Sequence, residues 1–273
     1  MSIPVGLQVY SIRDDAQKDF AAAMRAVKEM GYDFVELAGL YGMRPEEIRR
    51  ILDGCGLYAL SAHVPFVELA GDIARAAEDY AAIGCRYVAI PYLTEDLRPR
   101  EPGFEQVLNA IPTFAQELGK KGITLLYHNH DFEFVRMDDG SYALDYLYAR
   151  FTPAQLQTEL DTCWVKVAGE DPAAYIRKYA GRCPVVHLKD FFKEGKPADM
   201  YELIGIDAEK KKEAAGIFEF RPVGHGMQDV PAILSAAAES GAEYFIVEQD
   251  SSAVRPPMEA VRMSREYLKT LGV

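Results

Sequence analysis

The chain has 273 residues, of which 49% are hydrophobic and 26% are charged, and its net charge is −12 at pH 7. These proportions are typical of a globular protein and exclude a chain that is disordered throughout. The acidic balance argues against a nucleic-acid partner or an anionic membrane surface, because phosphate groups require concentrated basic charge.

The opening MSIPVGLQVYSIRDD lacks the basic start and long apolar segment of a secretory signal. No apolar run approaches the roughly 20 residues that a membrane span requires. The four cysteines have neither the spacing of a redox motif nor the density of a disulfide scaffold. We therefore expect a cytoplasmic protein with reduced thiols and no membrane partner.

Short apolar runs alternate along the chain with amphipathic stretches of helical period. This alternation is typical of parallel βα units, in which each strand is followed by a helix that packs on the sheet. The predicted strands are, in chain order, Val5–Tyr10, Phe34–Ala38, Tyr58–His63, Tyr87–Pro91, Thr124–Asn129, Leu156–Asp161, Val185–Lys189 and Tyr244–Gln249.

The segments between these strands have the apolar spacing of helices, and most end at a glycine suited to a left-handed C-cap. The least regular one is SYALDYLYARF, which is short and aromatic. The terminal MEAVRMSREYLKTLGV supplies a last helix.

Eight strands that alternate with about as many helices, with no linker between two halves, predict one closed α/β barrel: a (β/α)8 TIM barrel that spans residues 1–273 as a single domain. The competing doubly wound sheet would need a glycine-rich phosphate loop after its first strand, and VYSIRDD contains no G-x-G-x-x-G. The segment at about 191–226 is longer than an ordinary βα loop, and we expect it to lie over the barrel mouth.

Ionisable side chains gather where the predicted strands end, which is where the active site of such a barrel lies. They are Glu36, His63, His128, His130, Glu159, Asp161, His187, Lys189, Asp190 and Glu248. One histidine at a strand end is more commonly a structural residue, but imidazole and carboxylate groups on successive strands together favour a divalent metal. A nucleophilic triad has less support, because the chain has no G-x-S-x-G elbow.

The segments LLYHNHDFEF, ELDTCWVKVAGEDP, VVHLKDF, PVGHGMQD and YFIVEQD together resemble the xylose-isomerase-like superfamily of TIM barrels. That superfamily holds sugar isomerases and epimerases, inosose dehydratases and endonuclease IV. The resemblance implies one divalent ion, Zn, Mn, Co or Mg, held by four side chains from the last four strands. Matched by motif, these are Asp161, His187 and Glu248, with His128 where the family commonly has a glutamate.

The sequence departs from the endonuclease-IV pattern at Trp164, where those members carry a histidine, and FRPVGHGMQD lacks their further ligands. These departures argue against a three-metal nuclease, in agreement with the acidic charge.

The resemblance implies proton abstraction next to the carbonyl of a keto-sugar or related polyol, with the ion stabilising the enediolate. The expected function is a sugar isomerase or epimerase. A lyase, such as an inosose or keto-glycoside dehydratase, and a sugar-binding barrel without catalysis are the alternatives. Glu248 is the predicted base, and His130 or Lys189 is favoured as the acid, with His63 and Glu36 as further candidates. Since His128 replaces one of the paired glutamates of the epimerases, isomerisation with one base or β-elimination is favoured over true epimerisation.

The predicted substrate-binding residues are Tyr10, Glu36, His63, Trp164 and Arg221, and ordinary packing or ion pairing is the alternative for each. The expected partner is a small sugar or polyol, and a neutral substrate has at least as much support as a phosphorylated one, because the loop after the seventh strand has little basic charge besides Arg221. Association of copies through the mouth loops into a homo-oligomer is an open alternative.

Overall fold

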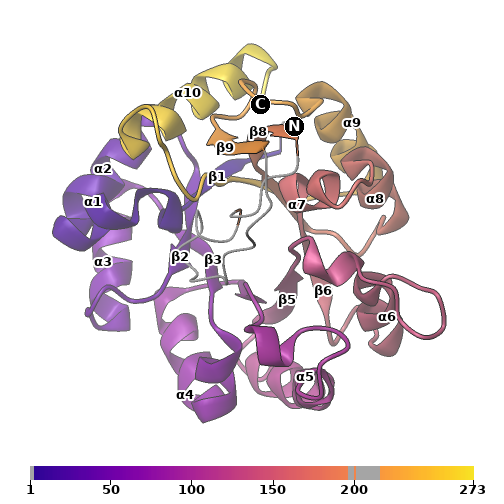
Figure 1. The fold of residues 1–273 in the computed structure, drawn as a ribbon. Coiled ribbons are helices and arrows are strands. Elements are labelled where there is room, and N and C mark those ends of the chain that lie inside the picture. Colours follow the sequence, from indigo (N-terminus) through magenta and orange to yellow (C-terminus); the bar gives the residue numbers. More distant parts are fainter. Residues whose placement is uncertain (1–2, 196–199, 201–215) are drawn as a thin grey trace.

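Eight parallel strands close into a barrel in the computed structural model, which describes residues 3–195, 200 and 216–273. Neighbouring strands follow the order β1-β10-β7-β6-β5-β4-β3-β2. Figure 1 looks along the barrel axis and shows the helices as an outer ring. The predicted (β/α)8 TIM barrel is confirmed.

The barrel strands match the predicted ones, although most end one or two residues earlier. After β1, for example, the chain turns into a short 3-10 helix, and Tyr10 N–H donates to the side chain of Gln8 at 2.9 Å. The site residues that close these strands therefore lie at or just beyond the sheet. The strands are β1 (Val5–Gln8), β2 (Phe34–Ala38), β3 (Ala59–His63), β4 (Tyr87–Ile90), β5 (Thr124–His128), β6 (Gln157–Asp161), β7 (Val185–Leu188) and β10 (Tyr244–Val247).

Local signals in the sequence explain where the helices begin and end. Asp19 caps α2 by accepting from the N–H of Ala22, and Gly31 closes this helix in the left-handed region with φ 91°. Short 3-10 helices, η1 (Val9–Ile12), η2 (Glu95–Leu97) and η3 (Phe132–Phe134), lie in the loops. The α-helices are α1 (Arg13–Lys18), α2 (Phe20–Met30), α3 (Pro45–Cys55), α4 (Phe66–Ile83), α5 (Phe104–Gly119), α6 (Ala143–Arg150), α7 (Thr162–Val167), α8 (Pro172–Lys178), α9 (Val230–Ser240) and α10 (Pro257–Thr270).

The interior of the barrel is layered along its axis. An apolar cluster that includes Phe34, Leu126, Val185 and Ile246 fills it from several strands. Because side chains two residues apart on a strand point to the same face, the next inward layer toward the mouth carries Glu36, His128, His187 and Glu248. The apolar layer thus forms the floor on which the polar side chains stand.

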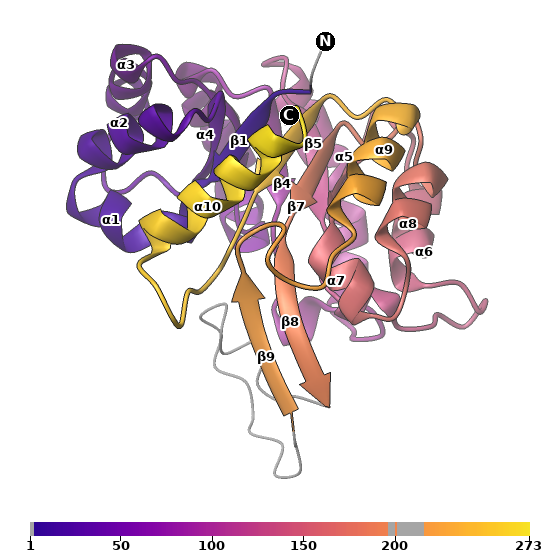
Figure 2. The same cartoon turned by 90° about the horizontal axis from the view of Figure 1, so that it is seen from above.

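An antiparallel hairpin of β8 (Asp190–Gly195) and β9 (Gly216–Arg221) follows β7. Figure 2 shows it projecting from the end of the barrel opposite to the two chain termini. The expected cover at 191–226 includes β9 and most of β8, whereas its residues 196–199 and 201–215 lie outside the described part. None of the described helices has the length and apolar character needed to cross a membrane.

Candidate metal centre and substrate cavity

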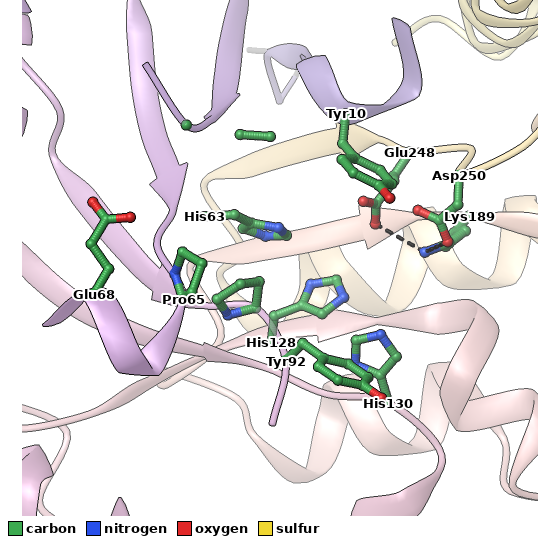
Figure 3. A pocket seen from close by; sticks show the side chains of 13 residues that line it. Tyr10, His63, Pro65, Glu68, Tyr92, His128, His130, Lys189, Glu248 and Asp250 are labelled. Carbon is green, nitrogen blue, oxygen red and sulfur yellow. Dashed lines mark hydrogen bonds and ion pairs between the residues drawn. The ribbon is translucent and has the colours of Figure 1, made fainter. Parts of the chain in front are cut away.

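A cavity of about 390 Å³ opens at the carboxyl ends of the barrel strands. Its size lies in the range of small-molecule sites. Figure 3 shows Glu248, Lys189 and Asp250 close together near Tyr10, and the rings of His63, His128 and His130 lie beside them in a chain of ring contacts. The residues that line it are Tyr10, Ala38, Gly39, His63, Pro65, Glu68, Pro91, Tyr92, His128, His130, Lys189, Glu248 and Asp250.

The four predicted metal ligands come together at the base of this cavity. His128, Asp161, His187 and Glu248 are buried, and each offers a ligand atom within 4.8 Å of the others. His128 Nε2 lies 3.6 Å from Asp161 Oδ2, and His187 Nδ1 lies 3.1 Å from Glu248 Oε2. Neighbouring strands thus supply two imidazoles and two carboxylates, a donor set that suits a divalent transition metal.

Asp161 has one carboxylate oxygen that is engaged in hydrogen bonds and one, 3.6 Å from the Lys189 ammonium, that accepts none from the described residues. Its Oδ1 caps α7 by accepting from the N–H groups of Cys163 at 2.7 Å and Trp164 at 3.1 Å. Its buried Oδ2 has no hydrogen-bond partner within the described part of the chain. Burial raises the pKa of Asp161 to about 6. A positive ion next to Oδ2 would offset this cost of burying the charge, so the residues present fit a bound metal.

His128 has the protonation state that a metal ligand needs. Burial lowers its pKa to about 3, so the ring is neutral near pH 7 and a nitrogen lone pair is free to coordinate. The next residue, Asn129, fixes the spacing between β5 and β6 beyond the end of the ladder. Its Oδ1 accepts from Asp161 N–H at 3.0 Å, and its Nδ2 donates to Asp161 O at 3.3 Å.

Lys189 is the cation of the cavity wall and is only 2% exposed. Its Nζ lies 2.5 Å from Asp250 Oδ2, 3.1 Å from Glu248 Oε2 and 3.6 Å from Asp161 Oδ2. Burial works against the charge, but these carboxylates outweigh it and hold the pKa of Lys189 well above its usual range. Lys189 therefore stays a cation.

Asp190 is not the partner of Lys189 that the adjacent sequence position suggests. Its Oδ2 accepts from the N–H groups of Gly224 and Gly226, each at 3.0 Å, and its Oδ1 from Gln228 N–H at 3.1 Å. A side chain at Gly226 would collide with Asp190, since its Cβ would lie 2.2 Å from Oδ1. Asp190 thus anchors the glycine-containing loop after β9.

A second group of buried ionisable side chains lies under the first. His63, His128, Glu159 and His187 also offer atoms within 4.8 Å of one another. His63 Nε2 forms a hydrogen bond of 2.7 Å with Glu159 Oε2. Glu159 Oε2 lies 3.3 Å from His128 Nδ1.

Glu36 completes this inner group on the side of His187. Its Oε2 lies 2.8 Å from His187 Nε2, its Oε1 accepts from Ser61 Oγ at 2.6 Å, and Gln8 Nε2 donates to Oε2 at 2.8 Å. Glu36 is fully buried and held on several sides.

The predicted substrate-binding residues separate into two sets. Tyr10 and His63 line the cavity, whereas Glu36, Trp164 and Arg221 do not. Trp164 is fully buried behind the wall, with its ring 5.1 Å from that of His130. Arg221 lies on β9 and pairs with Glu219. The structure thus places these three away from the cavity wall: Trp164 packs behind it, Glu36 contacts His187, and Arg221 pairs with Glu219 on the hairpin.

Sequence reasoning missed Asp250 and Glu68 in the cavity wall and gave Glu159 no role, whereas Tyr92 was a candidate for lining a sugar pocket, with ordinary packing as the alternative. Asp250 and Glu159 each lie two residues from a predicted ligand, so strand alternation was a signal for both. Glu68 lies in the first turn of α4 and carried no such signal. Tyr92 follows β4, and its ring contacts that of His130 at 5.1 Å.

A closed parallel barrel with imidazoles and carboxylates gathered at its carboxyl end belongs to the class of TIM-barrel proteins, and this donor set could hold a metal ion. The family model of the xylose isomerase-like TIM barrel matches residues 24–271, and the chain belongs to this family.

Named relatives agree with this assignment. The chain is 30% identical over 167 residues to an inosose dehydratase of Clostridium beijerinckii, covering 59% of this chain and 51% of that protein. The alignment thus spans about half the length of this first relative. An inosose dehydratase of Lacticaseibacillus casei is 22% identical over 98% of this chain and 97% of that protein. A solved sugar phosphate isomerase/epimerase of Parabacteroides distasonis superposes with a TM-score of 0.77 at 22% identity, with 98% of each chain covered. This structural likeness shows the fold alone.

Proposed function

We propose that the protein is a divalent-metal-dependent lyase that dehydrates a keto-polyol or keto-sugar, with an inosose as the first substrate to test. The observation that carries the proposal is the chemical difference between the two groups in the cavity wall. Glu248, Asp250 and Lys189 form one group, and His63, His128 and His130 form the other. A β-elimination needs unlike groups, a base and a hydrogen-bond donor, whereas two-base epimerisation needs two similar bases on opposite faces.

His128, Asp161, His187 and Glu248 would hold the ion, which when bound supplies Lewis-acid polarisation of the substrate carbonyl. Asp161 Oδ2, buried and without a hydrogen bond in the described structure, is the observation that supports this set. These four ligands and one divalent ion are thus parts of the proposal.

In the proposed reaction Glu248 takes the proton from the carbon next to the carbonyl. Burial works against its ionisation, but Lys189 and His187 outweigh this and hold the pKa of Glu248 well below its usual range, so the carboxylate is ready to accept. The electrons of the broken C–H bond form a carbon–carbon double bond as the C–O bond of the β-hydroxyl breaks, and that oxygen leaves as water after taking up the proton that Glu248 removed. His130 assists the departure through its ring N–H.

Lys189 binds a substrate oxygen in this scheme instead of releasing a proton, because its pKa is held well above the usual range. Tyr10 covers the same side of the cavity and offers a hydroxyl to the polyol. The substrate carries no phosphate, since Lys189 is the one lysine or arginine among the described residues that line the cavity, and carboxylates already surround it.

The relatives named inosose dehydratase support elimination at least as well as the isomerisation or epimerisation that the sequence resemblance placed first. Both outcomes begin with the same proton abstraction, so they must be separated by product. The test is incubation of the metal-loaded protein with an inosose and with a 3-keto-glycoside in deuterated water, followed by NMR analysis of the products.

Loss of water with formation of an unsaturated or diketo product supports the proposal, and chelator or Glu248→Gln should abolish it. Lys178→Met, a change of a surface ion pair far from the site, serves as the matched control and should retain the activity. Deuterium exchange with inversion at one carbon and no elimination would refute the lyase reading in favour of an epimerase. If the protein binds no divalent ion, the metal-dependent lyase is refuted, and a sugar-binding barrel without catalysis is the remaining alternative.

A further inference from the structure

We infer that Glu159 and Glu36 are positioning residues that orient the two histidine ligands from behind, each through the ring nitrogen that faces away from the metal. The inference rests on the metal centre proposed above, but not on the reaction assigned to it. It gives a role to two fully buried glutamates that do not reach the substrate cavity.

The two histidines use opposite ring nitrogens toward the proposed centre. His128 presents Nε2 to Asp161 at 3.6 Å, and His187 presents Nδ1 to Glu248 at 3.1 Å. Each ring therefore has one nitrogen left, Nδ1 of His128 and Nε2 of His187. Both are buried and lack an aligned hydrogen bond to any described residue.

A carboxylate oxygen lies next to each of these remaining nitrogens. Glu159 Oε2 is 3.3 Å from His128 Nδ1, and Glu36 Oε2 is 2.8 Å from His187 Nε2. A buried N–H group needs an acceptor, and a small rotation of either ring would align it with its carboxylate. Such a partner fixes the tautomer of a histidine ligand and raises its basicity toward the metal.

The two glutamates are themselves held in place. His63 Nε2 forms a 2.7 Å hydrogen bond with Glu159, while Ser61 and Gln8 both donate to Glu36. Contacts of 2.6–2.8 Å have the length of charge-assisted hydrogen bonds. The outer contacts among the ligand atoms, 3.1–3.6 Å, have the length of the edges of a metal coordination sphere. The inner group is assigned as the support because its carboxylates hold the shortest of these hydrogen bonds, and the outer group as the ion site because Asp161 Oδ2 accepts no hydrogen bond from the described residues.

The competing reading is that the inner group is itself an ion site, since His63, His128, Glu159 and His187 also have ligand spacing. The two readings predict different behaviour of the metal. If the inner group is a support, removing one of its carboxylates should weaken the binding of the outer ion. If the inner group is an ion site, the protein should still bind an ion when Asp161 is replaced.

The test is Zn²⁺ binding to protein stripped with a chelator, measured by competition with a chromophoric chelator. We expect one ion per chain in the wild type and a 10–100-fold weaker affinity in Glu159→Gln and in Glu36→Gln. Glu133→Gln is the matched control, because Glu133 is 1% exposed and its carboxylate binds Tyr127 and the backbone of His130 instead of a ligand. Its affinity should stay within about threefold of the wild type.

A second readout needs no variant. With ¹⁵N-labelled histidine, the five rings can be followed by NMR in the Zn²⁺-loaded wild type. We expect a proton on Nδ1 of His128 and on Nε2 of His187.

Unchanged affinity in both glutamine variants, or the reverse tautomers, overturns the positioning role while the metal centre stands. The positioning role is also overturned if the wild type binds two ions per chain. The same holds if Asp161→Ala binds Zn²⁺ fully and Glu159→Gln does not, because the glutamates would then be ligands themselves. If the wild type binds no ion, the proposed centre and the positioning role fail together.

Discussion

The buried charge of Lys189 offers the sharpest test of how the site is held together. Lys189→Met keeps the length of the side chain and removes its charge. Lys189, Glu248 and Asp250 are 2%, 4% and 3% exposed, so water cannot compensate for the lost cation. Removing one partner of a buried ion pair typically costs 3–5 kcal/mol, because the other charge stays buried. We expect the free energy of unfolding to fall by about 4 kcal/mol, which lowers the melting temperature by roughly 10 °C for a chain of this size.

The matched control is Lys178→Met on the outer surface. Lys178 Nζ lies 2.6 Å from Asp145 Oδ2, as close as Lys189 to Asp250, but its side chain is 47% exposed. Surface pairs contribute up to about 1 kcal/mol, so this variant should lose no more than that. Both variants are compared with the wild type by urea and thermal unfolding without metal, at the same pH.

Asp250→Asn in the Lys189→Met background provides the decisive comparison. It removes the carboxylate that lost its cation, so it should recover part of the stability, with a coupling energy of about 1–3 kcal/mol in the double-mutant cycle. If Lys189→Met loses no more than Lys178→Met, or if the double variant is less stable than Lys189→Met, the inference of a charged buried pair is wrong.

Three further predictions concern the surroundings of the site. Asp161→Ala should abolish stoichiometric Zn²⁺ binding, whereas Trp164→Phe, which keeps a ring behind the wall, should retain it; equal binding in both would remove Asp161 from the ligand set. Burial raises the pKa of Glu133 to about 8 from 4.5, so the folded protein holds a proton that the unfolded chain releases. Between these pH values the free energy of unfolding of the metal-free protein should therefore fall by up to about 5 kcal/mol as the pH rises, and Glu133→Gln should flatten this slope in urea titrations. Asn129→Ala removes the amide that bridges to the backbone of Asp161 and should cost about 1–3 kcal/mol; a loss below that range in thermal unfolding would contradict the bridging role.

The barrel was predictable because its signals are local. Each predicted strand overlaps an observed one, since the apolar runs and the glycine C-caps such as Gly31 are encoded within a few residues. The predictions of where the strands end were less accurate. There the sheet hydrogen bonds give way to side-chain contacts, such as those of Gln8 with Glu36 and of Asn129 with Asp161, which depend on neighbours distant in the sequence.

The hairpin was predictable only as a long segment. β8 begins directly after Lys189, and its strand partner β9 comes more than twenty residues later, so that no short-range turn signal joins them. Asp190 illustrates the difficulty, because its adjacent lysine suggests an ion pair, whereas its carboxylate accepts backbone N–H groups from the loop after β9.

The sequence predicted the residues of the proposed ligand set, but not which buried carboxylates would serve as ligands and which would support them. Glu159 and Asp161 both point inward from β6, and the sequence offers no distinction between two carboxylates at the same strand end. The distinction arises from depth in the barrel. Asp161 reaches the level of His187, where its Oδ2 accepts no hydrogen bond from the described residues, whereas Glu159 lies one layer deeper, in reach of His63 and His128. A barrel stacks its inward side chains in layers, so a strand that places two carboxylates two residues apart can supply both a metal ligand and the residue that supports a ligand. In this chain β6 places the two carboxylates, and His128 of the segment YHNH contacts both of them from the neighbouring strand β5.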